Sequence, residues 1–166
     1  APDKRSRLID QLLLRPEYVD YWSYKWSDLL LVSTRKLKGP AVWSFSNWVR
    51  QAVAENKPWD RFAQEIITAS GSTIENGAAN YFVLHKDAKL LNEATTVTFL
   101  GLSIGCAKCH SHKYDPISQR EYYQLFAYFN NVPEFGKFRR VGNSAPYMEA
   151  PTPDQFPKIR QLDDQL

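Results

Sequence analysis

Apolar residues recur at three- and four-residue spacing through the first half of the chain, and this spacing predicts helices. A first helix is expected over residues 4–15, with leucine and isoleucine on one broad face, and Pro16 stops it. A second helix follows over residues 17–32, and its apolar stripe suits burial. The stripe consists of Tyr18, Tyr21, Trp22, Trp26, Leu29 and Leu30.

A turn at residues 38–40 separates these helices from two more. One is predicted over residues 43–54, and the other begins near Pro58, whose fixed φ favours a first helical turn. A loop is expected over residues 70–80, where glycine, serine, threonine and asparagine crowd together. The helix at residues 43–54 would bury Trp43, Phe45, Trp48 and Val49.

The pattern changes before the cysteines. Asn92 resembles a cap for a helix over residues 93–104, although the β-branched run at residues 95–98 leaves a strand as the alternative. Together these segments predict a mainly α fold, an irregular helical bundle with long loops.

The last third carries two capping-box patterns. Ser118 and Glu121 form the first and open an aromatic helix, which Pro133 ends. The second, at residues 152–155, opens a polar terminal helix.

Composition narrows the class of protein. With 166 residues, 43% apolar and 14% aromatic, the chain is expected to form a single domain over residues 1–166. No stretch approaches the roughly 18 apolar residues of a membrane helix, so no membrane span is expected. The net charge of +3 is thinly spread, and Lys137, Arg139 and Arg140 are more typical of a solvated loop than of a nucleic-acid site.

The candidate chemistry lies at residues 106–110, where both cysteines of the chain fall in a Cys-x-x-Cys-His pattern. This spacing is what covalent haem attachment requires. The thiols of Cys106 and Cys109 would reach two vinyl groups on one edge of the porphyrin, while His110 would meet the iron. The sequence therefore predicts one haem c, with two thioethers and His110 as the proximal ligand.

Three alternative roles for the motif fit the sequence less well. In a thioredoxin-like redox pair the cysteines directly follow a buried strand, whereas a helix is expected before Cys106. A zinc site would place its histidines about a dozen residues beyond the cysteines, not at His110 and His112. A structural disulfide would explain the two cysteines but would not explain why His110 follows them.

The sequence does not determine which residue is the sixth iron ligand. Met148, the only methionine, lies in a proline-rich loop that could span the haem, and His85 is the other candidate. Core packing would also account for Met148, and a surface loop position would account for His85. His112 would lie on the same side of the ring as His110, so it is expected to form hydrogen bonds around the site or bind a haem propionate.

Several segments resemble a known family, the planctomycete cytochrome C domain of large exported bacterial proteins. Residues 106–117, followed by a pair of tyrosines, carry the likeness most specifically. Residues 56–62 look like that family's Asn-x-Pro-Tyr-Asp-x-Phe segment, and residues 26–30 resemble its Trp-x-Asp element. The likeness covers most of residues 5–132.

The resemblance implies a haem domain excised from a larger protein that is exported to the periplasm or cell surface. Residues 1–3 are no secretion signal, so the signal would have been removed or would lie upstream. We expect electron transfer with a redox partner protein or with other domains of the parent chain, rather than a stand-alone enzyme. Two rival functions are a haem enzyme with an open distal position and a structural or carbohydrate-interaction module with an accessory haem.

Overall fold

The structure, a computed structural model, describes residues 3–131 and residue 161. The chain divides into two units, Ala1–Val132 and Pro133–Leu166, and all described residues but one belong to the first. The single domain expected for the whole chain therefore stays a prediction. The capping box expected to open a terminal helix lies outside the described residues.

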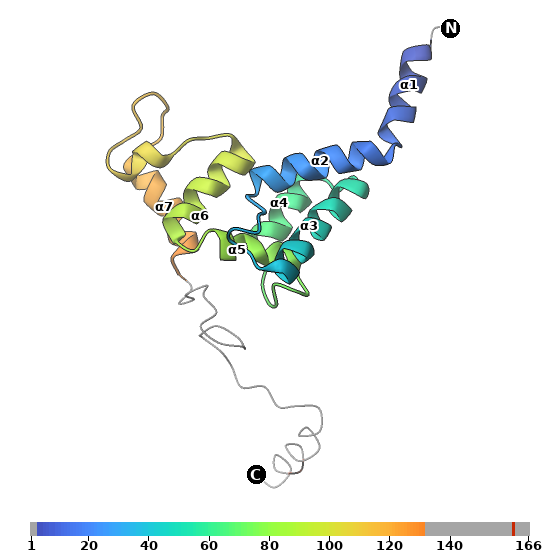
Figure 1. The fold of residues 1–166 in the computed structure, drawn as a ribbon. Coiled ribbons are helices and arrows are strands. Elements are labelled where there is room, and N and C mark those ends of the chain that lie inside the picture. The colour runs from blue at the N-terminus through green and yellow to red at the C-terminus, as the bar shows by residue number, and fades with distance from the viewer. Residues whose placement is uncertain (1–2, 132–160, 162–166) are drawn as a thin grey trace. The chain divides into compact units, whose positions relative to one another are not determined.

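Residues 3–131 form seven α-helices joined by shorter helical turns, and no strand occurs among them (Figure 1). The mainly α fold class is thus confirmed for this part of the chain, in which no helix is long and apolar enough to cross a membrane. The elements are α1 (Lys4–Leu13), α2 (Pro16–Leu29), α3 (Gly39–Ala54), α4 (Trp59–Ile67), η1 (Gly77–Ala79), α5 (Asn80–Leu84), α6 (Ala88–Thr95), η2 (Thr96–Leu100), η3 (Gly105–Lys108) and α7 (Gln119–Phe129).

A proline separates α1 from α2, as the sequence predicts. α1 ends at Leu13, and Pro16 is the first residue of α2, where a missing N–H costs no intrahelical bond. No residue of α1 is buried, so its leucine-rich face is exposed. The apolar stripe predicted along the second helix is only partly buried. Leu30 is fully buried, whereas Leu29 is 54% exposed.

α2 and α3 end in the same backbone motif. After α2, the N–H of Val32 donates to the carbonyl of Ser27 and the N–H of Leu31 donates to that of Asp28, which is the Schellman arrangement. Leu31 takes a left-handed φ of 59° there. The corresponding residue after α3 is Asn56, at φ 49°, and asparagine tolerates this region better than leucine does.

Leu31→Gly is expected to raise the free energy of unfolding by about 1 kcal/mol, because glycine takes a left-handed φ without the Cβ clash. Asn56→Gly should gain less, since asparagine already accommodates the conformation. Urea unfolding followed by circular dichroism measures both. A loss of stability in Leu31→Gly would show that the leucine side chain contributes more than its backbone costs.

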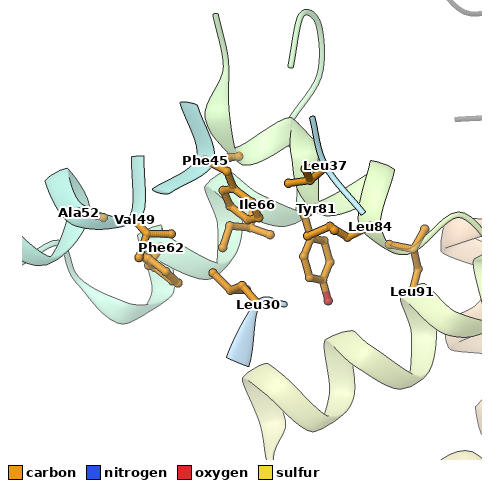
Figure 2. Packing of buried hydrophobic residues seen from close by; sticks show 11 residues of the cluster. Leu30, Leu37, Phe45, Val49, Ala52, Phe62, Ile66, Tyr81, Leu84 and Leu91 are labelled. Atoms are coloured by element: carbon orange, nitrogen blue, oxygen red, sulfur yellow. The ribbon is translucent and has the colours of Figure 1, made fainter. Parts of the chain in front are cut away.

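The main core is a cluster of buried apolar side chains from α2 to α6 (Figure 2). α3 contributes Phe45, Val49 and Ala52, whose helical spacing places them on one face. The prediction that Trp43 is buried is wrong, since its side chain is 70% exposed. The main core comprises Leu30, Leu37, Phe45, Val49, Ala52, Phe62, Ile66, Ala78, Tyr81, Leu84 and Leu91.

The loop predicted over residues 70–80 runs into a close contact with α3. Gly77 is buried at the start of η1, and a Cβ added to it would lie 2.4 Å from the carbonyl oxygen of Ser44 and 2.8 Å from the Cβ of Trp48. The Ser44 hydroxyl also donates to the carbonyl of Ile74 at 2.8 Å. The end of this loop is therefore fixed against the helix backbone.

The helix predicted over residues 93–104, with Asn92 as its cap, is wrong in its bounds. α6 begins earlier because the Asp87 carboxylate accepts the N–H of Lys89 at 2.7 Å and caps the helix. Asn92 lies fully buried inside α6. The alternative strand at residues 95–98 is also wrong, because the chain continues there in a helical path.

A wider helical turn, η2, follows α6. Its bonds are of the π type, and the Thr96 hydroxyl donates to the carbonyls of Asn92 and Glu93, at 3.0 Å each. Such side-chain bonds compete with the regular helix ladder. Gly101 ends the turn in the left-handed region, at φ 67°.

The capping box predicted for the start of α7 is confirmed. The Ser118 hydroxyl accepts the N–H of Glu121 at 3.2 Å, and the Glu121 carboxylate accepts the N–H of Ser118 at 2.8 Å. α7 packs against α6 and η3. Its buried residue Tyr122 forms a small second cluster with Ile104 and Ala107, which we name the site core.

Candidate functional site

The short turn η3 contains Cys106, and Cys109 caps its end. The N–H of Ala107 donates to the carbonyl of Ile104 at 2.9 Å, and the N–H of Cys109 donates to that of Cys106 at 3.4 Å. Residues three apart lie on the same side of a 3₁₀ turn, so the two cysteines project in the same direction. Both thiols are free and exposed.

The back of the same turn is anchored to α7. Ala107 is fully buried in the site core against Tyr122. The carbonyl oxygen of Lys108 accepts the Tyr123 hydroxyl at 3.0 Å and the Gln119 amide at 3.1 Å. The two residues between the cysteines therefore hold the turn, and the cysteines face outward.

His110 follows the turn with an exposed imidazole. Its Nδ1 lies 2.8 Å from the carbonyl oxygen of Ser111. A carbonyl cannot donate, so Nδ1 carries the proton and donates. In a neutral ring the Nε2 lone pair is then free to bind a metal, and this is how metal-binding histidines are usually oriented.

His112 organises the loop that follows. Its Nδ1 accepts the backbone N–H of Asp115 at 3.0 Å and that of Tyr114 at 3.4 Å, and the backbone N–H of His112 donates to the carbonyl of Ile117 at 2.8 Å. Its side chain is 9% exposed. These bonds lie within residues 112–117, so hydrogen bonding of His112 to the haem site and binding of a propionate both stay predictions.

Glu93 of α6 is a residue of the site that sequence reasoning missed. Its Oε1 accepts the Tyr122 hydroxyl at 3.0 Å and lies 3.3 Å from the Lys108 ammonium. Burial and the adjacent carboxylate raise the pKa of Tyr122 to about 12, so the hydroxyl keeps its proton and donates. The sequence gave no indication of this contact, because Glu93 was predicted only as the first residue of a helix over residues 93–104, whose bounds are wrong.

The donors at this turn do not surround a single point. Among the described residues, no group of three or more His, Cys, Asp and Glu side chains is placed to hold a metal ion. Zinc would need its ligands to converge as a tetrahedron. Attachment to a porphyrin instead distributes two thiols and one imidazole over two vinyl groups and the iron.

The comparisons with known proteins give a family but no annotated relative. A family model, PSCyt2, described as a protein of unknown function (DUF1549), matches residues 1–134. The chain belongs to this family. PSCyt2 is related to the planctomycete cytochrome C family, so the resemblance found in the sequence is confirmed. No curated protein and no solved structure matches the chain.

Of the two candidates for the distal ligand, His85 lies within the described residues 3–131. His85 caps α5 and is 6% exposed, so the alternative of a surface loop position is wrong. Its ring lies 4.6 Å from that of Tyr81, a residue of the main core. Burial, with a smaller contribution from Lys36, lowers the pKa of His85 to about 4. Met148 lies outside the described residues.

The structure also contains an aromatic pocket of about 240 Å³ between α2, the end of α3, and α4. Trp22 and Trp59 are each 43% exposed at this pocket, although Trp22 belongs to the stripe that the sequence predicts to be buried. No residue of η3 lines it. The rings around it are those of Tyr18, Trp22, Trp26, Trp59 and Phe62.

Proposed function

We propose that this PSCyt2 chain is a mono-haem c-type cytochrome domain that transfers electrons. Cys106 and Cys109 form thioethers with the haem vinyl groups, and His110 binds the iron through Nε2. When bound, the haem supplies one-electron chemistry between ferric and ferrous iron. The protein's part is to hold the group, orient the imidazole and control how much water reaches the ring.

The observation that carries the proposal is the arrangement of three exposed groups on one short segment. The two thiols project from the same side of η3. His110 follows at once, with Nδ1 donating to a backbone carbonyl and Nε2 free. A haem needs these three positions together, whereas a disulfide needs only the thiols.

A redox-active dithiol fits the same segment less well. Thioredoxin-like pairs lower the pKa of their thiol at the start of a long helix that follows a strand. Here Cys106 lies in the four-residue turn η3 and Cys109 caps its end, and the turn is reached from η2 through Gly101. The segment lacks the long helix whose dipole would activate a thiolate.

The proposal extends to location and partners. Covalent haem attachment to such a motif takes place outside the cytoplasm, so we propose that the protein is exported to the periplasm or cell surface. Its partner would be a redox protein or another domain of the parent chain. The distal ligand would be Met148, His85 or an exchangeable group, and the last option would make a haem enzyme the leading function.

The test is absorption spectroscopy of the chain produced with c-type maturation machinery. We expect covalently bound haem, visible after pyridine treatment, and a low-spin reduced form that does not bind carbon monoxide. Cys106→Ala and Cys109→Ala should each leave one thioether and shift the pyridine haemochrome band. The double variant should lose all covalent haem.

The outcomes separate the alternatives. Wild-type protein without covalent haem would overturn the proposal. The cysteines would then be assigned to a disulfide or to a metal site. A haem that binds carbon monoxide would keep the attachment but replace electron transfer by ligand chemistry. Gln124→Ala, at an exposed position of α7, serves as a control, since this side chain makes no hydrogen bond to η3 within residues 3–131.

A further inference from the structure

We infer that Glu93 is a positioning residue that holds the haem-attachment turn in place and compensates its charge. The inference rests on the proposed function, because it concerns the same turn. Glu93 binds neither the cysteines nor His110 directly. It acts through Lys108, the residue between Ala107 and Cys109, and through Tyr122 beneath them.

Both ends of η3 lie against the Glu93 carboxylate. At one end the Lys108 ammonium is 3.3 Å from Oε1. At the other, a Cβ on Gly105 would lie 3.6 Å from the carboxylate carbon and from Oε2, which is ordinary van der Waals distance. The Glu93 side chain therefore contacts the turn that presents the thiols at both of its ends.

The carboxylate is itself fixed from below. The Tyr122 hydroxyl donates to Oε1 at 3.0 Å. Tyr122 is 1% exposed, and its carbonyl accepts the side-chain amide of Asn92, the neighbour of Glu93 on α6, at 3.3 Å. Two consecutive residues of α6 thus hold one residue of α7, and this pairing sets the position of Glu93.

Lys108 is held by its main chain as well as by its side chain. Its carbonyl oxygen accepts the Tyr123 hydroxyl and the Gln119 amide from α7. Lys108 therefore joins α6, through Glu93, to α7. Because the next residue is Cys109, this junction orients the second thioether and the His110 that follows it.

The charges give Glu93 a second effect. Lys108 would be a cation close to a haem held by the neighbouring cysteines, and because haem has one more positive charge when ferric than when ferrous, this cation would favour the reduced form. Glu93 compensates that cation. Glu93→Gln is therefore expected to raise the midpoint potential, and Lys108→Met, which leaves the carboxylate uncompensated, is expected to lower it. The double variant should return towards the wild-type value.

The positioning effect can be measured without haem, in the full 166-residue chain. In Glu93→Gln the amides of Ala107 and Cys109, which close η3, should exchange about tenfold faster by NMR, because the bonds from Lys108 and Tyr122 then end on a neutral acceptor and are weaker. The amide of Val49 in the main core reports global stability and should exchange unchanged. Glu65→Gln, which removes the negative charge from a similar pair between Glu65 of α4 and Lys57, is the matched control.

Tyr122→Phe provides a second variant that keeps the carboxylate, and it should speed exchange at the same two amides by less. Unchanged exchange in both variants, or midpoint potentials that ignore Glu93 and Lys108, would overturn the inference. A wild-type chain that binds no haem would overturn the proposed function instead. The exchange measurement on haem-free protein would still test whether Glu93 holds the turn.

Discussion

Gly77→Ala is expected to lower the free energy of unfolding by about 3 kcal/mol, at the upper end of the usual cost of overpacking. The added Cβ would lie 2.4 Å from the carbonyl oxygen of Ser44, which belongs to the backbone of α3 and cannot swing aside. It would also lie 2.8 Å from the Cβ of Trp48. The helix and the turn must therefore separate, which disturbs the packing of Phe45 and Ala78 in the main core.

Urea unfolding followed by circular dichroism measures this loss. Gly39→Ala is the matched control, because a Cβ at Gly39 meets nothing within 4 Å and alanine is the better helix former. We expect that variant to be neutral or slightly more stable. If Gly77→Ala unfolded at the wild-type urea concentration, the close contact between η1 and α3 would be wrong.

Acidification is expected to cost the haem-free protein about 3 kcal/mol of stability between pH 6.5 and pH 4 through His85 alone. The folded state keeps this imidazole neutral, with its pKa lowered to about 4 by burial, whereas the unfolded chain protonates it near its usual 6.5. The unfolded state therefore binds more protons within this window. Stability falls as the pH falls through it, and below it both states are protonated and the loss is complete.

His85→Gln should remove this part of the pH dependence, so that the wild-type and variant curves differ in slope between pH 4 and pH 6.5. The charge of Lys36 contributes to the lowered pKa of His85, so Lys36→Met should narrow the pH window and slightly reduce the total loss of stability. Urea unfolding at a series of pH values measures all three proteins. Parallel curves for wild type and His85→Gln would mean that His85 titrates as freely as in the unfolded chain.

The same burial bears on the distal ligand. A neutral imidazole is the form that binds iron, and His85 is neutral above about pH 4. Yet its ring packs on Tyr81, a buried residue of the main core, whereas η3 packs on the site core. To serve as a ligand, His85 would have to leave this packing when haem binds, and the carbon monoxide test addresses that step.

Elements with local causes were predicted well. Pro16 and the Ser118–Glu121 box determine where α2 and α7 begin, because each acts on the backbone within a few residues. Burial was predicted less well, as Trp43 shows. α3 carries apolar residues on more than one face, so periodicity could not tell which face the neighbouring helices cover.

The predicted start of α6 was wrong for a related reason. Asp87 and Asn92 are both good caps by residue type, and only packing decides between them. In the structure Asn92 is fully buried, with its amide donating to Tyr122 of α7, a residue far along the chain. A contact of that kind has no signature in the local sequence.

The sequence by itself determined the helical fold class, the family and the spacing of Cys106, Cys109 and His110, because these depend on residues that are neighbours in the chain. Only the tertiary structure showed that Glu93 lies beneath the attachment turn and that His85 is buried beside Tyr81. Both depend on how separate helices pack, since burial and charge partners come from residues distant in sequence. The residues that carry the chemistry of the site are thus neighbours in the sequence, whereas the residues that hold them in place come from distant parts of the chain.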